Sequence, residues 1–160
     1  MAYSIDKTKN QINEIKKNIE VKKGELTKLE ETKQALIEGG MEIQGSKLDE
    51  KTQKIVMDVI DSALDENAEK GEELASDMNT DMSVLEDMKQ ETQESMESNS
   101  QERASLERKK AMMERFGLGR PIEEGISELD DNSQELSDVQ QALIDAQKEL
   151  SDVSTKLSSL

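Results

Sequence analysis

The feature that most constrains this chain is a seven-residue repeat of apolar side chains near its C-terminal end. From Ile122 to Leu157 every seventh residue is Ile or Leu. A second apolar series follows members of the first by three residues, at Val139, Ala146, Val153 and Leu160. This alternation of three and four places both series on one stripe of a helix. It predicts a helix over about 124–158. Leu in the first series with β-branched residues in the second favours higher-order helix packing over a parallel pair.

A similar repeat occupies the start of the chain. Ten core positions of the repeat lie between residues 5 and 36, and seven of them are Ile or Leu. The exceptions are Thr8, Lys22 and Lys33. We expect a helix over about 5–38 that ends at Gly39-Gly40, because glycine adopts the left-handed conformation that terminates helices.

The middle of the chain predicts two further helices, over about 47–97 and 101–116, which could also be one continuous helix. The first begins with the richest apolar stripe of the protein, formed by Leu48, Ile55, Val56, Val59, Ile60, Ala63 and Leu64. Residues 89–103 offer only Met96 as an apolar side chain, so we expect this stretch to stay outside any core, either as a solvated helix or as an apex near residues 98–100. A turn is expected at Gly117–Pro121, where glycine and proline follow a helix.

These patterns predict an all-α fold of elongated helical hairpins or a coiled-coil bundle, with three to four long helices in a single domain over 1–160. Only 32% of the residues are hydrophobic while 36% are charged, and Tyr3 and Phe116 are the only aromatic residues. This composition is too poor in apolar material for a thick globular core. Two arrangements fit the helix lengths: a rod with one long central helix, or a bundle with a turn near residues 98–100. The depleted stretch favours the rod.

The charge distribution bears on the class of partner. The net charge is −16, and residues 61–100 hold thirteen acidic residues against two lysines. Such a chain repels nucleic acid and anionic membranes, because binding to both depends on Lys and Arg. No apolar stretch is long enough to cross a membrane, and the charged N-terminus lacks the apolar core of a secretory signal. We expect a soluble protein that is cytoplasmic or is exported without a cleavable signal peptide.

The sequence offers no candidate for catalysis. Cys and His are both absent, which excludes disulfides, thiolate zinc sites, and Cys- or His-dependent catalysis. The best match to a calcium loop begins at Asp65, but it has Lys70 where the turn needs glycine and Ser76 where a bidentate Glu belongs. We therefore expect no catalytic residue, no bound cofactor and no metal site.

Candidate partner-binding residues fall into two groups. The first is the part of the apolar stripe on the last helix that packing within the chain would leave free. Its candidates are Leu129, Leu136, Val139, Leu143, Leu150, Val153 and Leu157. The second surrounds the turn and comprises Phe116 and Leu118 with the basic residues Arg108, Lys109 and Arg115. The basic residues could bind an acidic partner, the acidic face of the last helix, or a second copy, and charge matching between helices is favoured.

The turn residues also have two interpretations. Phe116 and Leu118 could form a projecting docking tip, since exposed aromatic residues often anchor interfaces, or they could staple the turn onto the helices that it joins. The staple is the favoured interpretation. The methionines between residues 78 and 113 also allow two interpretations, since they could line a partner-binding groove or fill a core. We expect them to fill a core.

A Cys-free, acidic chain with a long first helix followed by Gly39-Gly40 is similar in outline to the helical substrates and partner proteins of type VII secretion in Gram-positive bacteria, including the targeting regions of LXG-type toxins. The resemblance concerns architecture. The chain has no Trp and so no W-x-G turn, and no functional residue carries over. The resemblance implies a bacterial, secretion-associated protein.

Together these features predict a non-enzymatic protein that binds other proteins through helix packing, as a homo- or hetero-oligomer without nucleic acid and without insertion into a membrane. It could be a substrate or partner of a type VII-like secretion system. The alternative is a structural spacer or scaffold that is stable on its own.

Overall fold

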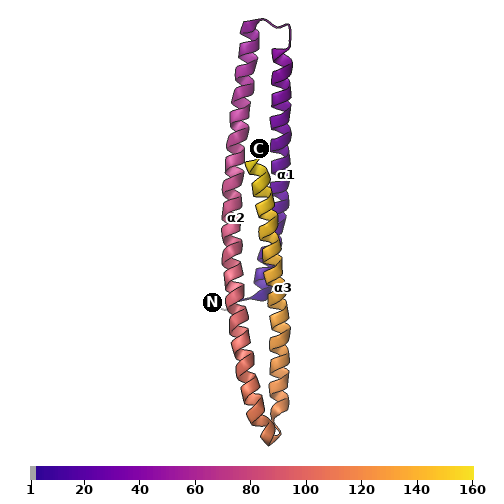
Figure 1. Ribbon diagram of the computed structural model, residues 1–160, viewed down its shortest axis with the longest axis vertical. Helices are drawn as coiled ribbons and strands as arrows, with labels where there is room; N and C mark the ends of the chain where they lie inside the picture. Colours follow the sequence, from indigo (N-terminus) through magenta and orange to yellow (C-terminus); the bar gives the residue numbers. More distant parts are fainter. Residues whose placement is uncertain (1–2) are drawn as a thin grey trace. The chain divides into compact units, whose positions relative to one another are not determined.

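The computed structural model describes residues 3–160, which form three long helices (Figure 1). Helix α1 spans Ile5–Gln44, α2 spans Glu50–Met113 and α3 spans Gly119–Ser158. A short 3-10 helix, η1, covers Glu114–Phe116. No strand occurs among residues 3–160, and the predicted all-α fold of long helical hairpins is confirmed.

Contacts divide the helices into two compact units. Unit 1 contains the chain up to Lys16 together with Met82–Lys148, and unit 2 contains Lys17–Asp81 together with Glu149–Leu160. Each of the three helices therefore contributes one part of its length to each unit. The division falls within the helices and not within the loops that connect them.

In unit 1, α2 and α3 form an antiparallel pair that ends at the turn after η1, and the first turns of α1 pack against part of this pair (Figure 1). The Tyr3 hydroxyl lies 2.8 Å from the Thr92 hydroxyl of α2. The buried apolar side chains of unit 1 come from all three helices: Ile12, Ile15, Leu85, Met88, Leu136, Val139, Leu143 and Ala146. Between residues 103 and 131 the unit consists of two helices only, because α1 begins beside Asn99 and Glu102. We call residues 103–131 the two-helix end of unit 1.

In unit 2, α1 and α2 form the antiparallel pair, and the last turns of α3 lie beside both (Figure 1). Gly71 of α2 faces this third helix, since a Cβ at Gly71 would lie 3.6 Å from Leu157 Cδ1. The buried apolar side chains are Ile19, Leu26, Leu29, Leu74, Met78, Leu150 and Val153. Because α3 ends at this level, the segments 37–44 and 50–64 pair without a third helix. We call them the two-helix end of unit 2.

The prediction that α1 ends at Gly39-Gly40 is wrong. The helix continues to Gln44, and neither glycine has a positive φ. Gly40 is buried, and a Cβ there would lie 3.5 Å from the Met57 side chain. Gly40 thus packs at the interface between α1 and α2 and does not terminate the helix.

Helix α2 starts at a side-chain cap. The Thr52 amide donates a hydrogen bond of 2.9 Å to Asp49 Oδ1, the arrangement of an N-cap residue. This hydrogen bond to Thr52 lowers the pKa of Asp49 below its ordinary value of 3.8. The loop before it is closed by Ser46, whose hydroxyl donates to the Ile43 carbonyl at 2.6 Å.

The turn predicted at Gly117–Pro121 is present but shorter. Gly117 has φ +69°, the only positive φ among the described residues, and the Leu118 amide donates to the Met113 carbonyl at 3.1 Å. This is a Schellman motif, which requires a residue in the left-handed conformation. Helix α3 already begins at Gly119, and Pro121 fits within its first turn, where no amide donor is needed.

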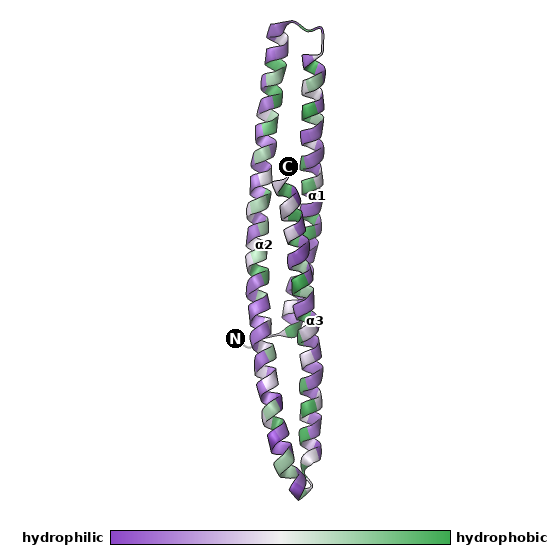
Figure 2. Cartoon of the chain, in the orientation of Figure 1, coloured by the Kyte–Doolittle hydropathy of each residue, from purple (hydrophilic) through white to green (hydrophobic). Residues whose placement is uncertain are grey.

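Helix α2 passes without interruption through residues 89–103, so it joins the two middle helices of the prediction and excludes a turn near residues 98–100. The expectation that this stretch stays outside a core is also wrong. Thr92 is fully buried, and Asn99 is 5% exposed. Both continue the seven-residue series of Met78 and Leu85, and each can be buried because its polar group is hydrogen bonded. Figure 2 shows apolar residues recurring between hydrophilic ones along all three helices.

Candidate functional site

The strongest candidate for a binding site is a groove in unit 2 at the end of α3. It has a volume of about 460 Å³ and is lined from all three helices. Ile37 contributes from α1, Leu64 and Ala68 from α2, and Leu157 and Leu160 from the end of α3. Its walls are mainly apolar, as expected of a site that accepts an apolar side chain or a helix.

Two polar contacts fix the helices around this groove. The Asn67 side-chain amide donates to the Leu29 carbonyl at 3.1 Å, which ties α2 to α1. The Lys33 ammonium group of α1 donates to the main-chain carbonyl of Leu160. The groove therefore lies between helices that are held by directional bonds as well as by apolar contacts.

Beyond the groove lies the two-helix end of unit 2, where apolar side chains are only partly covered. This segment contains the richest apolar stripe of the sequence, yet none of its large apolar side chains is buried. Half-buried positions are Ile37, Ile43, Val56, Met57, Ile60 and Leu64. A pair of helices leaves one side of each stripe open, and a third helix would be needed to cover it.

The surroundings of the groove are acidic. Residues 58–73 of α2 hold seven acidic side chains against Lys70, and all seven are exposed. Glu72 lines the groove itself, and Asp61 and Asp65 are exposed on either side of Leu64 along the helix. Lys33 also lines the groove, but its ammonium group binds the Leu160 carbonyl. The apolar floor and the excess of carboxylates on this part of α2 favour a ligand with an apolar face and basic edges.

The apolar stripe predicted as a partner surface on the last helix is already occupied within the chain. Leu136, Val139, Leu143, Leu150 and Val153 are each at most 3% exposed, and Leu129 and Leu157 are half-buried. Five of these seven candidates therefore belong to the core and are not a free surface. Packing against the other helices buries most of the stripe, and Leu157 at the groove and Leu129 in unit 1 remain partly exposed.

The residues predicted around the turn have a different environment. Phe116 is 76% exposed, Leu118 is 56% exposed and Met112 is 68% exposed, so the favoured staple interpretation is wrong for Phe116 and Leu118. Arg108, Lys109 and Arg115 are exposed as well. We call residues 108–120 the tip. It combines apolar and basic side chains at the end of the unit 1 hairpin.

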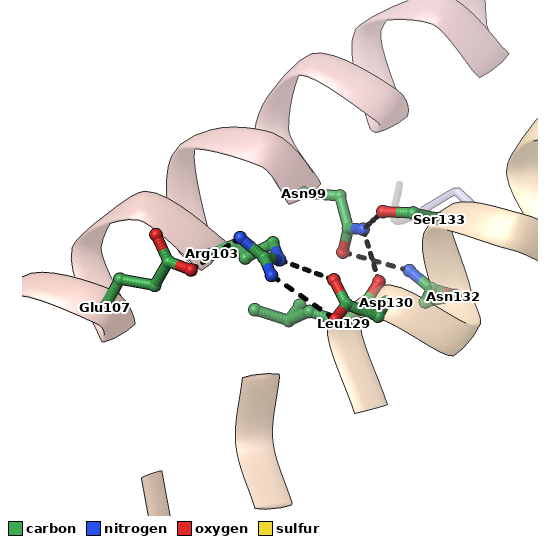
Figure 3. A network of polar contacts seen from close by, with 7 residues as sticks. All are labelled: Asn99, Arg103, Glu107, Leu129, Asp130, Asn132 and Ser133. Atoms are coloured by element: carbon green, nitrogen blue, oxygen red, sulfur yellow. Dashed lines mark hydrogen bonds and ion pairs between the residues drawn. The ribbon is translucent and has the colours of Figure 1, made fainter. Parts of the chain in front are cut away.

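A polar network holds the two-helix end of unit 1 (Figure 3). The Asn99 side-chain amide donates to the Leu129 carbonyl at 2.8 Å and also to the Ser133 hydroxyl. Its oxygen accepts from the Asn132 amide at 3.2 Å. The amide of Asn99 thus uses both of its donors and its acceptor across the interface between α2 and α3, which fixes the register of the pair.

Ion pairs extend this network towards the tip. Arg103 binds Asp130 of α3 and, at 2.7 Å, Glu107 of its own helix (Figure 3). Lys110 binds Glu123 of α3 at 3.0 Å. The hydrogen bond that Arg103 donates to Asp130 raises the pKa of Arg103, and the one that Lys110 donates to Glu123 raises the pKa of Lys110. Arg103 and Lys110 thus match charge between α2 and α3, whereas the predicted residues Arg108, Lys109 and Arg115 form no ion pair among residues 3–160.

The polar core residues Asn67, Thr92 and Asn99 were not among the candidates from the sequence. A signal for two of them was present: Thr92 and Asn99 lie 7 and 14 residues after Leu85, at core positions of one series. A polar residue at such a position indicates a hydrogen bond inside the seam. The calcium-loop candidate at Asp65 forms part of continuous helix α2.

Comparisons of the chain with protein-family models, with curated proteins and with solved structures found no match. Within residues 3–160, none of the helices is long and apolar enough to span a membrane.

Proposed function

We propose that this chain is a non-enzymatic interaction protein that binds an amphipathic helix of another polypeptide in the groove of unit 2. The observation that carries the proposal is the open side of the α1/α2 pair. Its apolar residues are half-exposed where α3 ends, and the groove is about 460 Å³ in volume. Covering such a surface with a helix releases about 25 cal/mol for each Å² of apolar area removed from water.

The shape and charge of the groove define the partner helix. It would follow the line that α3 occupies in the rest of unit 2 and would place apolar side chains at spacings of three and four residues against Ile37, Leu64 and Leu157. Basic residues on its edges would face Asp61, Asp65 and Glu72. Composition supports the non-enzymatic part of the proposal, because the chain contains no Cys and no His.

A photo-crosslinking side chain placed at Ala68 tests the proposal directly. Ala68 lines the groove but is exposed, so its replacement leaves the core intact. Irradiation of cells that naturally produce the protein should give a discrete crosslinked species. Ser62 is exposed on the same helix and is the matched control, because it does not line the groove. Crosslinking at neither position, or equally at both, would contradict the proposal.

The polar bonds inside each unit favour a second candidate, a structural spacer. Asn67 and Asn99 connect α2 to its neighbours through bonds that need no partner chain. A spacer predicts a monodisperse protein and no crosslink from Ala68. The resemblance to type VII secretion substrates and partners stays a prediction, and export would be compatible with either candidate.

A further inference from the structure

The tip and the groove have complementary surfaces. Residues 108–120 hold five basic side chains against Glu114, whereas residues 58–73 hold seven acidic side chains against Lys70. Within the described part of the chain, Arg108, Lys109, Arg115 and Arg120 form no ion pair. The tip therefore carries a net positive charge, and four of its basic side chains are available to a partner.

Apolar complementarity accompanies the charge. At the tip the exposed apolar side chains are Met112, Met113, Phe116 and Leu118. In the groove the apolar floor is formed by Ile37, Leu64, Ala68 and Leu157. A large exposed aromatic side chain next to flexible methionines is a typical anchor for an apolar groove.

We propose that the tip of a second copy of this chain docks in the groove of the first. The inference rests on the proposed function, since it names the polypeptide that fills the groove. With a net charge of −16, two copies repel each other over most of their surfaces. The approach of a basic tip to an acidic groove replaces that repulsion with attraction, so the charge pattern selects this pairing among the possible contacts between copies.

The contact joins two different surfaces, and each copy carries one of each. The contact can close between two copies that each insert a tip into the other's groove, or it can repeat from copy to copy as an open chain or a ring. Assembly should therefore grow with protein concentration. It should also weaken as salt screens the charges, over a range in which the Debye length falls from about 10 Å to about 3 Å.

Two variants, both with substitutions at exposed positions, test the tip and the groove independently. The tip variant is F116S/L118S, which removes the apolar anchors. The groove variant is A68R/E72K, which places positive charge on the groove. S62R/E69K is the matched control, because it changes the charge by the same amount at exposed positions of α2 that do not line the groove. Circular dichroism checks that each variant keeps its helix content.

Light scattering on the full chain and its variants then tests the inference. The wild type and the control should assemble with rising concentration, and each of the other two variants should need at least about tenfold more protein, as expected when hot-spot residues are lost. An equimolar mixture of the tip and groove variants should form a dimer and go no further, because only one intact tip and one intact groove remain between them.

Three results would overturn the inference. The first is a wild type that stays monomeric at 100 µM, roughly the upper range of the assay. The second is a tip variant that assembles at the same concentrations as the wild type, which would show that Phe116 and Leu118 are not in the contact. The third is a crosslink from Ala68 to a different protein without any product of twice the chain mass, which would leave the proposed function standing. If the proposed function and this inference both fail, Ala68 should give no crosslink at all.

Discussion

The two-helix end of unit 1 is held by polar side chains that cross from α2 to α3, whereas that of unit 2 is held by apolar contacts. Asn99, Arg103 and Lys110 each bind a residue of α3 in unit 1. Among the described residues of the unit 2 end, no hydrogen bond or ion pair joins 37–44 to 50–64. Directional polar bonds can thus hold a helix pair that buries little apolar area, whereas a pair held by apolar contacts can leave much of its apolar area exposed.

The largest expected effect comes from comparing equal apolar deletions at a covered and an open position. Leu143→Ala should lower the free energy of unfolding by about 3 kcal/mol, because Leu143 is fully buried and the change leaves a cavity. Leu64→Ala should cost only about 1 kcal/mol, since Leu64 borders the open groove. Urea unfolding followed by circular dichroism measures both. Equal losses would show that something covers Leu64.

The polar connections of the two units should differ in strength. Asn99→Ala should cost about 2 kcal/mol, because it removes three bonds and leaves Asn132 and Ser133 with unpaired groups. Asn67→Ala should cost about 1 kcal/mol, since Asn67 makes one such bond. The same unfolding experiment gives the order, and a larger loss for Asn67 would refute this ranking.

Glycines at the two ends should respond to alanine with opposite signs. Gly39→Ala should stabilise the protein by up to about 1 kcal/mol, because Gly39 lies inside α1 and a Cβ there meets nothing within 4 Å. Gly117→Ala should destabilise it by about 1 kcal/mol, because a side chain is strained at φ +69°. The shift in thermal unfolding temperature shows the sign. A stabilising Gly117→Ala would argue against the Schellman turn.

The smallest expected effect is a dependence of stability on pH at the N-cap of α2. Since the folded-state pKa of Asp49 lies below 3.8, its contribution to stability is present above that value and is lost as the pH falls through the folded pKa. The Thr52 amide resonance should titrate with this transition in NMR spectra. Asp49→Asn should abolish the titration and keep the cap, because Asn is also a good N-cap residue. A titration that survives in the variant would assign it to another group.

The repeat of Leu and Ile predicted most of the fold. It identified the three helical regions and the turn after Phe116, because apolar residues on one stripe must be buried against other helices. It left the continuity of α2 open while favouring one long helix, and it did not place residues 89–103 in a core, since Thr92 and Asn99 resemble solvated residues until their partners are known. Gly39-Gly40 resembled a helix end for a related reason: the packing of α1 on α2 at Gly40 is a tertiary contact that local preference does not report.

The candidate site was predicted less well. Seven stripe residues of the last helix were expected to be free, but which side of a stripe remains open depends on where the neighbouring helices end. The levels on α2 at which α1 begins and α3 ends decide this, and that tertiary register does not follow from the repeat. The tip was recognised from composition, since Phe116 and the basic residues are unusual in this chain, but its exposure required the structure.

Helix α2 is one element of 64 residues that serves both units. Adding one residue near Asp81 would rotate every side chain on one side of the insertion by about 100° relative to the other. One of the two seams would then lose its partners. Insertions and deletions in this helix should therefore be tolerated best when they nearly restore the helical phase, as a change of seven residues does.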